Sequence, residues 1–360
     1  MASIASCPFP GVDRFKDCGE KNKVVGYIDS VLSGFAQIVL SDNPVTGLLV
    51  MLGVFLAAPS QLLAALTAAC TAVPFAHLVG VNPFLIRHGY YSFSAAVCGL
   101  GVSLWGFSVQ PVYPQLLLYS ALAGVLSVIL FAAVGAFLAK WEVPGLSVAY
   151  WITLMIMIPT LHYASGLNAV PFLSPALSEV TQTPMTFELS TFAAATIAGI
   201  AEICFQFETA SGICLLLAIL VSSRVDALVA LICSAAGTAV AIAIGLPEGN
   251  ILIGLYGFNA ALTGIGLFGR AFRMSVASAL FTLVMAAASV FLMAALSAVF
   301  LPLGIPVAAL PFGLIVITCM ITKSSFGKLT PVSALLWGVP ETIEKALKAK
   351  DAEEKQAVSY

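Results

Sequence analysis

Charged residues are scarce in this chain of 360 residues: Asp, Glu, Lys and Arg together make up 9% of it, against 60% for hydrophobic residues. A soluble protein carries about a quarter of its residues as charges, so an ordinary water-exposed surface is excluded. The net charge of −2 also lacks the basic excess that nucleic-acid binding needs, and we expect no nucleic-acid partner. The mean hydropathy of +1.05 indicates a polytopic α-helical membrane protein.

Lysine and arginine are absent from one long internal stretch, between Lys140 and Arg224. Basic residues gather instead near the two ends of the chain, and positive charge marks the cytoplasmic side of membrane proteins. We therefore expect both termini to be cytoplasmic and the connector at 163–189 to lie on the other side, extracytoplasmic. Two halves that each cross an odd number of times insert in opposite orientations, so the sequence predicts an inverted repeat.

Residue patterns for bond-making chemistry are missing as well. His77, His88 and His162 show no metal-ligand spacing, and the sequence has no nucleophile–base pair and no phosphate-binding glycine loop. Six of the eight cysteines lie in apolar segments, where they are expected to be small buried hydrophobes rather than disulfide partners. We expect no enzyme activity, no metal and no cofactor.

Apolar runs long enough to approach a bilayer crossing recur along the chain. The clearest are 45–73, 115–138, 148–161, 191–204, 212–221, 228–244, 274–300 and 306–321. Their uneven lengths blur the number of crossings, and Gly and Pro cluster beside them, as is tolerated where backbone lines a cavity. We predict an all-α fold with about five transmembrane helices plus one re-entrant pore helix in each half.

Two stretches, 86–101 and 251–266, read almost alike: IRHGYYSFSAAVCGLG and ILIGLYGFNAALTGIG. Eight of their sixteen positions are identical at a constant offset of 165 residues. The same offset pairs Gln37 with Glu202 and Gly47 with Gly212, so one register covers more than half of each copy. In an apolar chain, such a repeat is typical of transporters and channels whose two halves build one path.

The charge pattern and the repeat together divide the chain into five parts. We expect a cytoplasmic N-terminal arm at 1–26, a first inverted repeat at 27–162, the connector at 163–189, a second inverted repeat at 190–326 and a cytoplasmic C-terminal tail at 327–360. Arg270 and Arg273 flank a short loop in the second repeat, and we expect them to act as topology determinants.

Four short motifs resemble those of the urea transporter family. GLYGFNAAL at 254–262 resembles a signature of the family's second half, and QIVLSDNPVTG at 37–47 resembles its opening motif. KWEVP at 140–144 and GIPVAALPF at 304–312 stand where that family has its Leu-Pro-x-x-Thr-x-Pro-Phe elements. The resemblance runs from about Gly34 to Glu341.

The resemblance implies a homotrimer with one pore in each subunit, in the plasma membrane or a cell inner membrane. Ten crossing helices and two re-entrant pore helices would surround a slot-shaped filter. It also implies a passive, channel-like path for urea, a flat neutral amide. A slot with aromatic walls and oxygen acceptors along one edge accepts that shape and rejects hydrated ions.

Gln37 and Glu202 match residues on the oxygen-rich edge of the family's filter. An acid within an apolar helix is costly unless it has a task or a partner, so the alternative for Glu202 is a plain interhelical hydrogen bond. Tyr91, Phe93, Tyr256 and Phe258 are candidates for the slot walls, with helix packing as the alternative. Leu40 and Phe205 are weaker candidates for the same walls.

Ser147 and Ala309 fall where the family has threonines at the constriction, so one hydroxyl is kept and one is lost. This departure puts strict selectivity for urea in question. Asn43, Ser94 and Asn259 are expected to be structural polar residues near the pore that cap or cross-link broken helices. Two rivals stay open: a channel of the same fold for ammonia, water or a short amide, and a proton-coupled transporter that uses Glu202 or Glu208.

Overall fold

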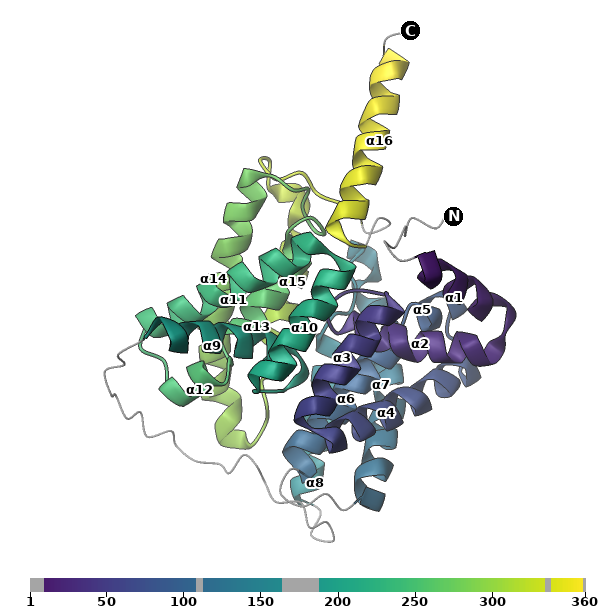
Figure 1. The fold of residues 1–360 in the computed structure, drawn as a ribbon, viewed down its shortest axis with the longest axis vertical. Coiled ribbons are helices and arrows are strands. Elements are labelled where there is room, and N and C mark those ends of the chain that lie inside the picture. The colour runs from purple at the N-terminus through teal and green to yellow at the C-terminus, as the bar shows by residue number, and fades with distance from the viewer. Residues whose placement is uncertain (1–9, 108–112, 164–187, 334–337, 359–360) are drawn as a thin grey trace.

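A computed structural model describes residues 10–107, 113–163, 188–333 and 338–358 of the chain (Figure 1). These residues form helices and no β-strand, so the predicted all-α fold is confirmed. The connector at 163–189 lies almost entirely outside the described residues.

The first part of the chain forms α1 (Pro10–Lys21), α2 (Lys23–Gln37), α3 (Pro44–Ala57), α4 (Pro59–Leu78), α5 (Pro83–Arg87), α6 (Tyr90–Phe107), α7 (Tyr113–Leu138), the 3-10 helix η1 (Ala139–Trp141) and α8 (Val148–Tyr163). The second part forms α9 (Leu189–Ala201), η2 (Glu202–Cys204), α10 (Thr209–Ser222), α11 (Arg224–Ala243), α12 (Glu248–Leu252), α13 (Gly257–Leu267), α14 (Val276–Phe300), η3 (Leu301–Leu303) and α15 (Leu310–Ile321). η4 (Lys323–Ser325) and α16 (Pro340–Val358) follow.

The helix bounds repeat along the chain. α10, α11 and α12 begin and end 165 residues after α3, α4 and α5. Each of the three helices of the first copy begins with a proline, whose fixed φ and missing N–H suit the first helical position. The matching helices of the second copy do not begin with proline. The backbone is therefore repeated more closely than the residue types are.

Two glycines of the repeated motif are required by the fold. Gly89 and Gly254 precede α6 and α13 and have left-handed φ angles of 79° and 82°. A methyl group on Gly89 would overlap the backbone of Ser33 and Gly34 in α2, and one on Gly254 would overlap the matching segment of α9. The short helices α5 and α12 can therefore turn into α6 and α13 directly against a neighbouring helix.

Four helical segments among the described residues are long and apolar enough to cross a membrane: Pro59–Leu78, Tyr113–Trp141, Arg224–Ala243 and Val276–Leu303. A fifth candidate is the pair Leu189–Cys204 and Thr209–Ser222, which is bent by 72° at its break. The chain is therefore an integral membrane protein. About five crossings per half stays a prediction, because it needs the shorter apolar helices α3, α8 and α15 to take part.

One expected span proves to be two helices. The apolar run 45–73 is divided at Ala58, which has φ −147° and separates α3 from α4. Pro59 cannot donate a backbone hydrogen bond, so it starts a new helix rather than continuing α3. Hydrophobicity alone does not register this break, because the residues on both sides of it are apolar.

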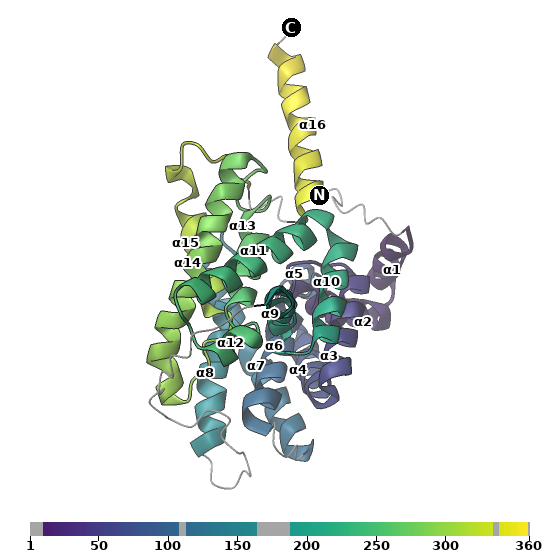
Figure 2. The ribbon, with the colours of Figure 1, turned by 60° about the vertical axis from the view of Figure 1, so that its left-hand side comes forward.

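The two halves of the chain meet along α3 and α10, which lie side by side in both views (Figures 1 and 2). Thr46 Oγ1, near the start of α3, donates to the Ala218 carbonyl in the second half of α10, at 3.1 Å. Gly53, further along α3, lies against Ser211 and Leu215 in the first half of α10. The two helices therefore run antiparallel. One buried apolar core includes residues from both halves.

The base of α16 lies near the upper end of the molecule in Figures 1 and 2, and the rest of α16 projects upward from it, while α1 lies at the right-hand edge of both views. The far end of α8 lies at the opposite end of the molecule.

Candidate functional site

Each half contains a helix that breaks where the sequence places a candidate pore residue. α2 ends at Gln37, and α9 ends just before Glu202. Leu40 and Phe205, three residues after Gln37 and Glu202, both adopt the left-handed backbone conformation with φ 57°. Residues with a Cβ rarely adopt this conformation. The chain then turns into α3 and α10. The break is thus the same in both halves, down to the unusual dihedral angle.

The side chains at the two breaks are satisfied differently. Gln37 is 6% exposed, and its Nε2 donates to the His88 carbonyl at 3.0 Å. Glu202 is 5% exposed, and its Oε2 has no hydrogen-bond partner in the described part of the chain. Buried polar atoms are nearly always paired. The Glu202 oxygen is therefore an acceptor that the protein itself leaves available.

The two left-handed residues are also held differently. The ring of Phe205 lies 4.8 Å from the ring of Trp105, centroid to centroid. The carbonyl of Leu40 accepts a hydrogen bond of 3.0 Å from Arg270 Nη2. In both cases the contact comes from the other half of the chain.

The four candidate wall residues, Tyr91, Phe93, Tyr256 and Phe258, are all buried. Tyr91 packs edge-on against Phe131 at 5.3 Å, and Phe93 packs edge-on against Tyr150 at 5.9 Å. Tyr256 and Phe258 are 3% and 1% exposed. These contacts hold Tyr91 and Phe93 in fixed orientations, whether their faces line a path or fill the core.

Ser147 and Ala309 lie in direct contact. Ser147 Oγ donates to the Ala309 carbonyl at 2.7 Å, and Trp151 Nε1 donates to the Pro306 carbonyl at 3.0 Å. Both bonds join the segment that starts α8 to the segment that starts α15. The two predicted constriction residues thus come together from opposite halves, and the serine proton is used within the protein.

Asn259 and Ser94 occupy matching positions of the repeat, but only the Asn259 side chain forms hydrogen bonds in the described part of the chain. Asn259 Nδ2 donates to the Ala308 carbonyl at 3.2 Å, and Asn259 Oδ1 accepts from the Phe312 N–H at 3.0 Å, so α13 is tied to the start of α15. Ser94 is fully buried, and its Oγ has no partner among the residues that the structure describes. A serine is too short to make both of the bonds that an asparagine makes here.

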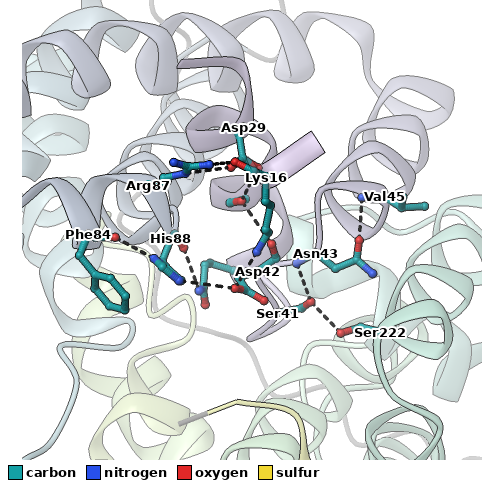
Figure 3. A network of polar contacts seen from close by, with 12 residues as sticks. Lys16, Asp29, Ser41, Asp42, Asn43, Val45, Phe84, Arg87, His88 and Ser222 are labelled. Carbon is teal, nitrogen blue, oxygen red and sulfur yellow. Dashed lines mark hydrogen bonds and ion pairs between the residues drawn. The ribbon is translucent and has the colours of Figure 1, made fainter. Parts of the chain in front are cut away.

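A polar network surrounds the break of the first half (Figure 3). Asn43 Oδ1 accepts from the Val45 N–H at 2.9 Å and so caps α3. Ser41 Oγ accepts from the Asn43 N–H and shares a hydrogen bond of 2.7 Å with Ser222 Oγ at the end of α10. The loop after Leu40 is therefore fixed to both halves.

Charged side chains continue the network toward the N-terminal helix. Lys16 Nζ in α1 lies 2.8 Å from Asp42 Oδ2, and His88 Nε2 lies 3.9 Å from the same oxygen (Figure 3). Arg87 pairs with Asp29 of α2 and donates to the Lys16 carbonyl. α1 is thus held against the first-half break by ion pairs. Glu208 matches Asn43 in the repeat, and its Oε2 accepts from the N–H of the adjacent Phe207.

Sequence reasoning missed three residues that contact the candidate site: Arg270, Trp105 and Tyr150. Arg270 was expected at a loop as a topology determinant, but it is 1% exposed and pairs with Asp226 at 2.6 Å. A signal for two of them was present, because Trp105 and Arg270 are 165 residues apart and so occupy the same position of the repeat. The described residues include no group of three or more His, Cys, Asp or Glu placed to hold a metal ion.

Comparison with known proteins identifies a family. The family model described as "UT: Urea transporter" matches residues 28–324. Urea transporter 1 of Mus musculus is 25% identical over 272 residues, which cover 73% of this chain and 70% of that protein. Urea transporter 1 of Ovis aries is 24% identical over 271 residues, with the same coverage.

Proposed function

Because the chain belongs to the urea transporter family, we propose that it is a facilitative channel that conducts urea down its gradient through a narrow, slot-shaped pore. Membership of the family implies transport of urea across a membrane. The channel mechanism and the residues that form the pore are the proposal. Urea is neutral, so its passage needs neither a coupling ion nor a charged binding site.

The unpartnered Oε2 of Glu202 carries the proposal. Urea has four N–H donors at the edges of a flat molecule, and its passage through a dry segment requires acceptors that replace water. A carboxyl oxygen accepts a hydrogen bond whether or not the group is ionised. Within the proposed pore, Glu202 offers such an oxygen. Gln37 marks the matching level of the other half, where its carbonyl oxygen is the acceptor.

The start of α8 and the start of α15 form the proposed constriction. The Ser147 hydroxyl donates its hydrogen bond to the Ala309 carbonyl. The lone pairs of Ser147 Oγ therefore remain available to accept from a urea N–H. Ala309 supplies a backbone carbonyl instead of a hydroxyl. The aromatic residues Phe93 and Phe258, with Tyr91 and Tyr256, are proposed to form the walls that restrict the path to flat solutes.

The topology proposal is an inverted repeat with both termini in the cytoplasm. It is supported by the antiparallel contact of α3 with α10, which are matching elements of the two copies. It is also supported by the position of α16 at one end of the molecule, with the far end of α8 at the other (Figure 1). The homotrimer is proposed from the family resemblance, and cross-linking in native membranes tests it.

Reconstitution into liposomes tests the transport proposal. Stopped-flow shrinkage with urea, thiourea, acetamide and glycerol gives the permeability to each solute. We expect fast urea flux that a proton gradient does not drive. Glu202→Leu should lower urea permeability several-fold or more, because the lost hydrogen bond is worth about 1 kcal/mol or more. Glu202→Gln, which keeps an acceptor oxygen of the same reach, should retain most of the flux.

Gln37→Leu is the matched control for stability. It removes the hydrogen bond to the carbonyl of half-buried His88 and should lower the free energy of unfolding by about 0.5–1.5 kcal/mol. Glu202→Leu should leave stability unchanged or higher, because it removes a buried oxygen that has no partner. If Glu202→Leu conducts urea as fast as the unmutated protein does, Glu202 is not part of the pore. Accumulation of urea driven by a pH gradient would identify a coupled transporter, and flux of acetamide without urea would identify a channel for another solute.

A further inference from the structure

Position 105 of the first half and position 270 of the second half are equivalent in the repeat, yet they carry unlike residues. Trp105 lies in the last turn of α6, and its ring packs against the ring of Phe205. Arg270 follows α13, and its guanidinium donates to the backbone of Leu40. Since Leu40 and Phe205 are themselves equivalent, the same pair of positions makes contact in both halves, once by ring packing and once by a hydrogen bond.

Arg270 is buried too deeply to act as a surface charge. It is 1% exposed, and its two terminal nitrogens form a bidentate pair with Asp226, at 2.6 Å to Oδ1 and 2.8 Å to Oδ2. Nη1 also donates to the Ile265 carbonyl at 2.9 Å. A guanidinium is costly inside a protein unless its donors and its charge are matched. The bidentate pair with Asp226 therefore fixes the plane of the Arg270 guanidinium and leaves Nη2 directed at Leu40, while Nε has no partner among the described residues.

Leu40 needs a contact of this kind. Its φ of 57° is unfavourable for a residue with a Cβ, and its side chain has no ring that a partner could stack on. Its N–H donates to the Gln37 carbonyl at 3.0 Å, and its carbonyl accepts from Arg270. These two bonds fix both peptide planes of Leu40 and thus the direction of its side chain.

We propose that Arg270 is a positioning residue for transport: it holds Leu40 as one wall of the solute path, as Trp105 holds Phe205 as the other. The proposal rests on the proposed function, because it takes Leu40 and Phe205 as pore walls. Arg270 touches the backbone of a wall residue and not the solute. Its removal should therefore widen the slot, which changes discrimination by solute size more than the permeability to urea itself.

The test is the ratio of urea to N,N'-dimethylurea permeability in liposomes that contain the full chain. The variant Arg270→Met with Asp226→Asn removes the donor and avoids an unpaired buried carboxylate. We expect this ratio to fall about tenfold, the scale of one lost hydrogen bond from a charged donor. Arg273→Met is the matched control, since Arg273 pairs with Glu344 and Asp351 of α16. Its ratio should stay at the unmutated value.

A double-mutant cycle separates positioning from general loosening. In a Leu40→Ala background the wall side chain is already missing, so the change at Arg270 and Asp226 should have no further effect on the ratio. Arg270→Lys, which keeps the charge but not the bidentate geometry, should give a smaller fall in a protein that still folds. An additive effect in the Leu40→Ala background would overturn the proposal, and so would an unchanged ratio in a folded Arg270→Met, Asp226→Asn variant.

Hydrogen–deuterium exchange gives a second measurement that does not depend on transport. Exchange of the backbone amides at 38–43 should speed up in the Arg270→Met, Asp226→Asn variant, and exchange at 203–207 should not. If the unmutated protein conducts no urea, the proposed function is wrong, and the exchange result still decides whether Arg270 holds Leu40. Equal exchange at 38–43 in both proteins overturns the positioning role.

Discussion

Leu40 and Phe205 have the same φ angle of 57° at the same position of the repeat, but a buried ion pair holds the first and an aromatic ring packs against the second. The same contrast continues beside them. Gln37 donates to the His88 carbonyl, while an oxygen of Glu202 is left without a partner in the described residues. The backbone of the two halves is alike where their side-chain chemistry is not.

The second half does not simply lose bonds that the first half keeps. Asn259 in the second half makes two bonds to the segment that starts α15, while Ser94 in the first half leaves its hydroxyl unpaired. Each half thus has one satisfied and one unsatisfied member of these two pairs. The comparison teaches that the fold needs the glycine and helix-break positions in both copies, whereas the polar positions are free to specialise.

The largest expected effect comes from changing what the halves share. Gly89→Ala and Gly254→Ala should each lower the free energy of unfolding by about 3 kcal/mol or more, because the new methyl group overlaps backbone that cannot move and φ is left-handed. Thermal unfolding of the purified protein in detergent measures both. Similar losses of unfolding free energy in the two variants would show that this close backbone contact contributes equally to stability in the two halves.

Gly80→Ala is the matched control for this pair. Gly80 has φ 77°, but no atom lies within 4 Å of the position of a new Cβ. Only the backbone strain applies there, at about 1–2 kcal/mol. A loss in Gly89→Ala no larger than that in Gly80→Ala would mean that the close contact with α2 does not constrain the fold.

The parts of the fold that depend on periodic or local signals were predictable from the sequence. The repeat, the all-helical class and the apolar helices α7 and α14 follow from residue identities at fixed spacing and from long apolar runs. The break between α3 and α4 was not predicted, because a single proline decides it within a continuous apolar run. The short helices α5 and α12, each of which ends just inside a repeated stretch, were also not predicted.

The candidate site was predictable in its positions but not in its contacts. The family motifs named Ser147 and Ala309, and the structure brings them together. The burial of Arg270 was missed, because positive charge near a short loop usually marks a membrane surface. Its partner Asp226 lies 44 residues away in another helix, and no local pattern joins the two.

An intermediate effect is expected from exchanging the residues at positions 94 and 259. Asn259→Ser should lower the free energy of unfolding by about 1–3 kcal/mol, because the Phe312 N–H and the Ala308 carbonyl lose their partner. Ser94→Asn replaces a hydroxyl that has no partner among the described residues, so no existing hydrogen bond is lost. It should lower the free energy of unfolding by less than Asn259→Ser does. Thermal unfolding compares the two variants. Equal losses would remove this part of the difference between the halves.

The smallest expected effect concerns the start of α11, which the C-terminal helix supports. Glu341 in the first turn of α16 accepts from Ser223 Oγ at 2.7 Å and from the Val225 N–H at 3.0 Å. The matching helix of the first half, α4, has Ala58 at its N-cap position and no side-chain cap. Glu341→Ala should therefore cost only about 0.5–1 kcal/mol, as the loss of one helix-capping contact does.

This last variant decides whether the C-terminal helix acts on the pore or only on stability. Ser223 Oγ also accepts from the Asp226 N–H, and Asp226 aligns Arg270, so a continuous set of contacts joins α16 to the Leu40 carbonyl. Since α11 keeps its own Ser223 cap in Glu341→Ala, we expect Asp226 to stay in place and the solute permeability ratio to be unchanged. Lys348→Ala, an exposed change on the same helix, is the control. A ratio that falls in Glu341→Ala but not in Lys348→Ala would mean that the C-terminal helix acts, through Asp226 and Arg270 of the second half, on the proposed pore wall at Leu40 of the first half.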